Sequence, residues 1–120
     1  MTPIPRPTLP ALLFALSCLA ALPVRAAENP VLWGYGVRGC ADFTAAAKQA
    51  EAGDFAEYQR YEDWLTGFVS GLNLALGTDA LSGSGIDSAM RHTREECGKH
   101  PSDDFFNAAM RFVRTLSTLR

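Results

Sequence analysis

The chain has 120 residues, of which 11 are Lys or Arg and 13 are Asp or Glu, giving a formal net charge of −2. This acidic balance argues against a nucleic-acid-binding protein, which would present a basic face. The length allows one modest hydrophobic core, and no internal repeat or long linker divides it. We therefore expect a single folded domain.

Residues 1–26 have the pattern of a cleaved secretory signal peptide. Arg6 precedes an apolar run, Leu9–Val24, and Val24-Arg25-Ala26 has small residues at the two positions that a signal peptidase reads. The run is shorter than the roughly 20 apolar residues that cross a bilayer. We expect export to the periplasm, no stable membrane insertion after cleavage, and a mature domain of residues 27–120. Removing Arg6 and Arg25 leaves 9 basic against 13 acidic residues.

An alternative interpretation of the N-terminal segment concerns Cys18. The stretch Ala15-Leu16-Ser17-Cys18 loosely resembles the cleavage box of a lipoprotein, which would place a lipid on Cys18. The residues after Cys18 stay apolar, whereas a lipidated mature end is normally polar. Cleavage after Ala26 is therefore the favoured interpretation.

Two cysteines, Cys40 and Cys97, remain in the mature domain. An even number of cysteines in an oxidising compartment predicts a disulfide, and two cysteines allow one intramolecular pairing. The long loop that this bond closes gives about 4 kcal/mol of stabilisation in the chain-entropy model. Two free thiols are the alternative. A metal site is disfavoured because these cysteines and the two histidines lack ligand spacing.

An extended lead-in and four helices are expected in the mature domain. The lead-in, residues 29–39, is rich in glycine, and we expect its Trp33 and Tyr35 to fold back over the core. The expected helices run from near Asp42 to Gly53, from a cap at Asp54 to Gly77, from a cap at Ser84 to Cys97, and from a cap at Ser102 to the end. Glu57, three residues after Asp54, and Asp87, three residues after Ser84, would complete a helix capping box at each of these two starts.

The predicted fold is all-α: a small four-helix bundle with an extended N-terminal lead-in, stapled by one disulfide. The last two turns of the second helix, Phe68–Leu76, are apolar on nearly every side, so we expect them to be buried on most faces. The loop 78–85 consists of small residues and is expected to be flexible.

Few residues point to catalysis. His92 and His100 lie in no nucleophile motif, and His92 is interpreted as part of a solvated helix face. Pairing of the cysteines leaves no thiol for covalent catalysis. The adjacent carboxylates point about 100° apart on a helix, so surface charge and helix capping explain them better than catalysis. They are Glu62-Asp63, Glu95-Glu96 and Asp103-Asp104. We expect no enzyme activity, no catalytic residue, no cofactor and no metal.

The second helix contains two glycines one turn apart, Gly67 and Gly71. Glycine costs about 1 kcal/mol in a helix interior relative to alanine, so something must offset this cost. The favoured interpretation is a helix backbone that crosses closely inside the fold. The alternative is a surface for a partner or for a homodimer. Trp64 and Phe68 belong to the same candidate surface, and Trp64 is expected in the core or at its rim.

Several of these elements together resemble the HdeA-like family of small periplasmic helical proteins. The resemblance rests on Cys40-Ala41-Asp42-Phe43, on Tyr61-x-x-Trp64-Leu65-x-Gly67-Phe68-x-Ser70-Gly71, and on His100-Pro101 before Phe105-x-x-Ala108. It covers nearly the whole mature chain. It implies a compact α-bundle whose one disulfide joins two helices, here through Cys40 and Cys97.

The resemblance also implies a function without catalysis. The best-known members are acid-activated chaperones, dimeric at neutral pH, whose monomers shield unfolding periplasmic proteins in acid. The chain is also similar to immunity proteins against type VI secreted amidases, in its Gly-x-x-x-Gly helix and in the His-Pro start of its last helix. We therefore expect a binding protein for other proteins, either unfolded periplasmic clients or one effector enzyme.

Overall fold

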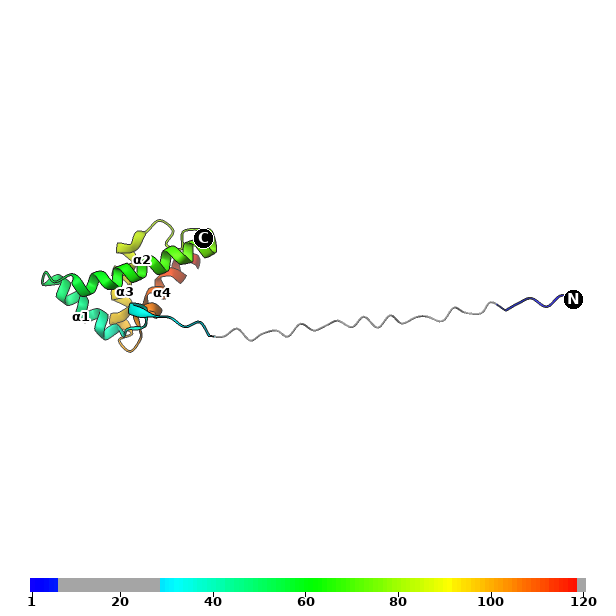
Figure 1. Ribbon diagram of the computed structural model, residues 1–120, viewed down its shortest axis with the longest axis horizontal. Helices are drawn as coiled ribbons and strands as arrows, with labels where there is room; N and C mark the ends of the chain where they lie inside the picture. Colours follow the sequence, from blue (N-terminus) through cyan, green and yellow to red (C-terminus); the bar gives the residue numbers. More distant parts are fainter. Residues whose placement is uncertain (7–28, 119–120) are drawn as a thin grey trace.

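The computed structural model describes residues 1–6 and 29–118, which contain four α-helices and one 3-10 helix. In chain order these are η1 (Gly34–Val37), α1 (Cys40–Glu51), α2 (Ala56–Leu76), α3 (Gly85–Lys99) and α4 (Phe105–Thr118) (Figure 1). The predicted all-α fold is thereby confirmed. The predicted signal-peptide cleavage site and Cys18 lie outside the described residues. Within residues 1–6 and 29–118, no helix combines the length and apolar character needed to cross a membrane.

The helix ends agree with the sequence where glycine stops a helix. Gly77 ends α2 in the left-handed conformation, with φ of 67°, and its N–H donates to the carbonyl of Asn73 at 2.8 Å. Gly53, with φ of 98°, follows the last turn of α1 in the same region of backbone space. Glycine reaches this conformation without the steric cost that a Cβ would add. Both helix ends could therefore be predicted from the sequence.

Of the predicted side-chain caps, Asp54 accepts the N–H of Ala56, the first residue of α2, at 3.3 Å, and the others are wrong. Asp104, rather than Ser102, caps α4, because its Oδ1 accepts the N–H of Asn107 at 2.7 Å. Ser84 makes no capping bond at the start of α3, and its hydroxyl instead donates to the carbonyl of Leu81. Glu57 turns away from Asp54 toward the lead-in. A cap depends on the backbone angles of the first turn, which the spacing of residue types does not determine.

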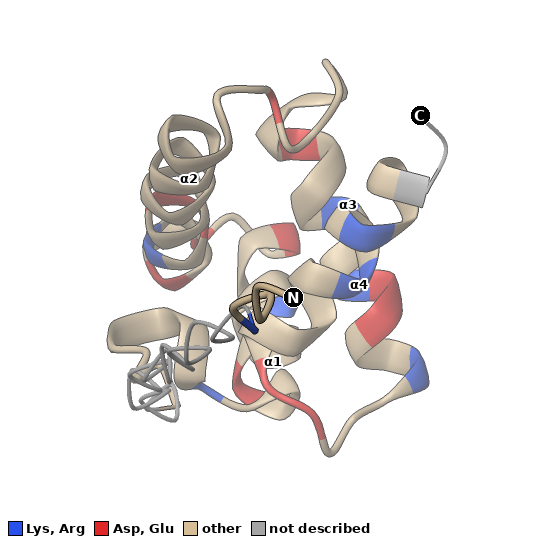
Figure 2. Cartoon of the chain, turned by 90° about the vertical axis from the view of Figure 1, so that its right-hand side faces the viewer, with Lys and Arg blue, Asp and Glu red and all other residues tan. Residues whose placement is uncertain are grey.

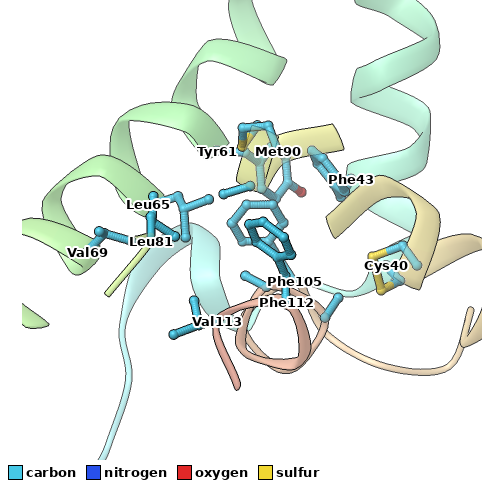
Figure 3. Packing of buried hydrophobic residues seen from close by; sticks show 14 of the residues in the cluster. Cys40, Phe43, Tyr61, Leu65, Val69, Leu81, Met90, Phe105, Phe112 and Val113 are labelled. Atoms are coloured by element: carbon cyan, nitrogen blue, oxygen red, sulfur yellow. A yellow bond between two sulfur atoms is a disulfide. The ribbon is translucent and has the colours of Figure 1, made fainter. Parts of the chain in front are cut away.

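Three buried rings form the centre of the core (Figure 3). Phe43 of α1, Tyr61 of α2 and Phe105 of α4 are at most 1% exposed, and their ring centroids lie 4.7–5.0 Å apart. Aromatic pairs at such distances add to the stabilisation that burial alone provides. These rings join three helices at one point.

The predicted disulfide is confirmed. It joins Cys40, the first residue of α1, to Cys97 in the last turn of α3, with the two Cα atoms 5.1 Å apart. Both cysteines are almost completely buried (Figure 3). The bond therefore fixes the start of α1 against the end of α3 beside the aromatic core.

The loop between α2 and α3 is anchored rather than flexible. Ala80 and Leu81 are each 3% exposed, so the middle of the loop contributes to the core. The side chain of Asn73 accepts the N–H of Ala80 at 2.7 Å, and Asp79 accepts the N–H groups of Leu81 and Gly83. The expectation of a free loop is wrong because one apolar residue among many small ones is enough to attach it.

Replacing Tyr61 by phenylalanine is expected to stabilise the fold. The Tyr61 hydroxyl is buried and forms no hydrogen bond within the described residues. Removing such a group is expected to add up to about 1 kcal/mol to the free energy of unfolding, because the nearby Arg38 guanidinium compensates its desolvation only in part. In a domain of this size that corresponds to about 4–8 °C in a thermal melt followed by circular dichroism.

The same substitution gives a pH dependence in alkali. Burial raises the pKa of Tyr61 above its ordinary value of 10.0. The folded chain then holds the phenol proton more tightly than the unfolded chain, so this contribution to stability is present below pH 10 and is lost as the pH rises further. The advantage of Tyr61→Phe should therefore grow above pH 10. Tyr35→Phe, which removes a hydrogen-bonded hydroxyl, is the control and should not melt higher. A Tyr61→Phe protein that melts below the parent would contradict the assignment.

Candidate functional site: an apolar groove between the lead-in and α2

The lead-in is held against α2 by Trp64. The indole Nε1 of Trp64 donates a hydrogen bond to the carbonyl of Trp33 at 2.8 Å. Tyr35 packs edge-on against Tyr61 with 4.8 Å between ring centroids. The prediction that the lead-in folds back is therefore right for Tyr35 and wrong for the Trp33 side chain, which is 79% exposed.

Gly36 makes the close contact between the lead-in and Trp64 possible. It is buried, and a Cβ built on its backbone would overlap the ring carbons of Trp64. The six-membered ring of Trp64 thus lies directly under the backbone of η1. Of the two positions expected for Trp64, the core or its rim, the structure shows the rim. The contact of Trp64 with Phe105 connects this rim to the buried rings.

A polar cluster around Glu57 closes one end of the lead-in. The Tyr35 hydroxyl donates to the Glu57 carboxylate at 3.2 Å, and the guanidinium groups of Arg38 and Arg60 each lie 3.6 Å from it. Arg60 also donates to the Tyr35 hydroxyl, a hydrogen bond that raises the pKa of Arg60. One carboxylate thus connects two residues of the lead-in to α2. The sequence assigned Glu57 to a helix cap, and the signal missed was the pair of cations, Arg38 and Arg60, that flanks it.

An apolar groove of about 460 Å³ runs between the lead-in and α2. Its walls are Val31, Leu32, Trp33, Asp63, Trp64, Gly67 and Phe68. The Trp64 and Phe68 rings stack at 5.3 Å, and Phe68 meets the edge of Phe106 at the same distance. Val31 is 69% exposed, so the apolar wall of the lead-in faces solvent in the folded chain. Three of these residues, Trp64, Gly67 and Phe68, belong to the candidate partner surface predicted from the sequence. Val31 and Leu32 were not predicted to be part of it.

Beyond the groove, the surface of α2 carries a second glycine, Gly71, one turn after Gly67. Both glycines are exposed, and no described atom outside their own helical turn lies within 4 Å of a Cβ built on either. The interpretation that a helix crosses here inside the fold is therefore wrong for the described residues. The expected burial of Phe68–Leu76 is also wrong, because Leu74 is 86% and Leu76 59% exposed. Apolar residues on all sides of these turns do not ensure that other elements cover them.

Among the described residues that line the groove, Asp63 is the one that carries a charge. No Lys or Arg follows it along the chain until Arg91. The carboxylate of Asp63 forms no ion pair with any described residue. Most of the basic residues of the helices lie on α3 and α4 (Figure 2). The wall of the groove therefore carries one unpaired negative charge, that of Asp63.

A second pocket, of about 390 Å³, lies between α3 and α4. Here the ring of His92 stacks on Phe112 at 4.1 Å, and its Nδ1 lies 2.8 Å from the carbonyl of Ser88. The prediction that His92 belongs to a solvated face is wrong, since the residue is half-buried. Arg111 crosses the pocket to form ion pairs with Glu96 and Asp103.

The groove presents indole, phenyl and aliphatic surface with one carboxylate, Asp63, in its wall. This composition suits the binding of apolar polypeptide surface, since exposed apolar patches rimmed by polar groups mark protein-interaction sites. In the described part of the chain, no three His, Cys, Asp or Glu side chains lie close enough together to hold a metal ion. No family model, no curated protein and no solved structure matches the chain.

Proposed function

We propose that this protein is a periplasmic, non-enzymatic binding protein that shields unfolding proteins under acid stress, as in the HdeA-like family that its sequence resembles. The observation that carries the proposal is the apolar groove between the lead-in and α2. Its Val31 and Trp33, together with Leu74 further along α2, offer an unfolding client exposed apolar surface without any rearrangement of the core.

The ion pairs that connect one element to another support an acid response. Arg38 pairs with Glu57 between the lead-in and α2, Arg94 with Glu51 between α3 and α1, and Arg111 with Asp103 and Glu96 around α4. Each of them needs an ionised carboxylate. Asp and Glu side chains have reference pKa values near 4, so they become neutral at about pH 2.5 and leave the cations to repel one another. The Cys40–Cys97 bond then keeps α1 attached to α3 while further apolar surface becomes accessible.

The test is suppression of aggregation. The mature, disulfide-bonded protein is mixed with an aggregation-prone periplasmic protein, and light scattering is followed at about pH 7 and about pH 2.5. We expect suppression in acid and its loss after reduction. The double variant Val31→Ser/Trp33→Ser, which removes exposed apolar groups of the groove, should suppress less. Phe55→Ser removes a 60% exposed ring at the start of α2 and is the matched control. Absence of suppression at both pH values would rule out the chaperone function.

Glu57→Gln is expected to imitate acid locally at neutral pH. The substitution removes the charge that holds Arg38 and Arg60 together, and we expect it to weaken docking of the lead-in by about 0.5 kcal/mol, the scale of exposed ion pairs. A background of Trp33→Phe leaves Trp64 as the only tryptophan, so its fluorescence reports the docking. The emission at pH 7 should shift toward the acid value of the parent. Glu95→Gln, which alters an exposed carboxylate on α3, is the control, and an equal shift in both variants contradicts the role of Glu57.

A second candidate is an immunity or inhibitor protein that binds one secreted cell-wall amidase. The observation that favours it is that the groove is already formed in the fully folded chain, so binding needs no acid. We expect in this case stoichiometric inhibition of the amidase on peptidoglycan at neutral pH, lost in Val31→Ser/Trp33→Ser and kept in Phe55→Ser. Inhibition that is equally strong in the groove variant would exclude this use of the groove.

A further inference from the structure

We propose that the groove and the exposed face of α2 that follows it bind an amphipathic helix of a partner protein, and that this helix carries Lys or Arg beside its apolar face. The inference rests on the protein-binding function proposed above and specifies the chemistry of the partner. The surface consists of the groove residues together with Gly71 and Leu74 and is called the α2 surface below.

The shape of the α2 surface favours a helix over an extended segment. Gly67, Gly71 and Leu74 follow one another at i, i+4 and i+7, so they form one line along α2. Trp64, three residues before Gly67, begins this line, and Phe68 lies beside it. The backbone N–H and C=O groups here bond within α2, so they are not free to pair with a strand. An amphipathic helix that inserts apolar anchors into such a channel is the common solution for a groove along a helix.

The two glycines indicate how closely the partner approaches. Each costs about 1 kcal/mol in helix stability relative to alanine. Gly36 is required by the fold, because the Trp64 ring fills the place of its Cβ, but nothing in the described residues occupies that place at Gly67 or Gly71. Without side chains at these two positions, another helix can approach the α2 backbone more closely than the usual 8–10 Å between helix axes. The line from Trp64 to Leu74 rises by ten residue steps, about 15 Å, which matches roughly three turns of a partner helix.

The charge of the partner follows from a carboxylate that the fold leaves unpaired. Glu51, Glu57, Glu96 and Asp103 all have cationic partners within the chain. Asp63, the charged residue in the groove wall, has none among the described residues. The nearest basic residue on α2 is Arg60, which already contacts Glu57 and Tyr35. A basic helix would form an ion pair with Asp63, whereas an acidic helix would be repelled at the same place.

Two synthetic helical peptides of about 16 residues test the inference. Both have the same leucine face, and their polar face carries lysine in one peptide and glutamate in the other. Binding to the disulfide-bonded protein is measured by calorimetry at pH 7. We expect the lysine peptide to bind at least about tenfold more tightly at low salt, and the difference to shrink as salt is added. Asp63→Asn should reduce the difference, whereas Glu95→Gln on α3 should leave it unchanged.

A steric variant locates the peptide on the α2 surface. Gly71→Leu is expected to fold, since there is open space at this position and leucine is the better helix former. It should weaken binding of the lysine peptide at least about tenfold by blocking close approach. Gly98→Leu makes the same change at an exposed glycine of α3, also in open space, and should have no effect.

The outcomes separate this inference from the proposed function. Equal affinity for the two peptides, or full binding by Gly71→Leu, overturns the inference even if acid protection of clients is observed. Selective binding of the lysine peptide with no protection of clients at either pH supports the inference and removes the chaperone function.

Discussion

Removal of the disulfide is expected to lower the free energy of unfolding by about 4 kcal/mol. The bond joins residues separated by 57 positions, and the chain-entropy model assigns about this much to a loop of that length. Small domains have net stabilities of about 5–15 kcal/mol, so the loss is a large fraction of the whole. The double variant Cys40→Ala/Cys97→Ala removes the bond without burying a new polar group. Urea unfolding followed by circular dichroism measures the difference.

Reduction of the parent protein provides the second arm of this experiment. The reduced parent and the double alanine variant should unfold at similar urea concentrations, and reducing agent should not affect the variant. A difference of less than about 1 kcal/mol between oxidised parent and variant would contradict the role of the bond, because the entropy of the unfolded chain alone predicts more. A loss confined to α1 and α3, detected by hydrogen exchange, would indicate local rather than global stabilisation.

The parts of the fold that were predictable depend on short-range signals. The glycines at 53 and 77 stop α1 and α2 because backbone conformation is a property of the residue itself. The Cys40–Cys97 pairing follows from counting, since only one combination exists once Cys18 is assigned to the signal segment. Helical spacing of apolar residues likewise places Phe43, Leu65 and Phe112 in the core, where the structure has them.

The parts that were not predictable depend on contacts between distant residues. The sequence shows that the end of α2 is apolar, but burial of Leu74 requires another element to reach it, and none in the described residues does. The sequence alone does not distinguish the surroundings of Gly67 from those of Gly36. Gly67 faces open space, whereas Gly36 lies against the ring of Trp64. Glu57 fits a local capping pattern, whereas its actual partners, Tyr35 and Arg38, precede it by about twenty residues. The spacing of residue types along the chain does not show which distant residues a side chain such as Glu57 will contact in the fold.

Gly36→Ala is expected to detach the lead-in from α2 and to lower stability by about 2 kcal/mol, the usual scale of overpacking. The new methyl group would occupy the position of the Trp64 ring carbons, and a rigid indole wedged against Phe68 and Phe105 cannot turn aside. The lead-in is the element that can move. Its movement should stop at Arg38, because the carbonyl of Arg38 accepts the N–H of Phe105 at 2.9 Å and Cys40 is held by the disulfide.

The measurement uses Trp64 fluorescence in the Trp33→Phe background, together with thermal unfolding. Detachment exposes the indole and removes its hydrogen bond to the carbonyl of residue 33, so the emission should shift to longer wavelength while the helical circular dichroism is retained. Gly67→Ala is the matched control on α2, and it should stabilise the fold by up to about 1 kcal/mol, since its Cβ meets open space. The opposite signs of two Gly→Ala changes next to the same groove would show that the lead-in wall is built by close packing and that the α2 wall is left open. An unshifted emission in Gly36→Ala would mean that Trp64 gives way instead, and that the groove is more plastic than its packing indicates.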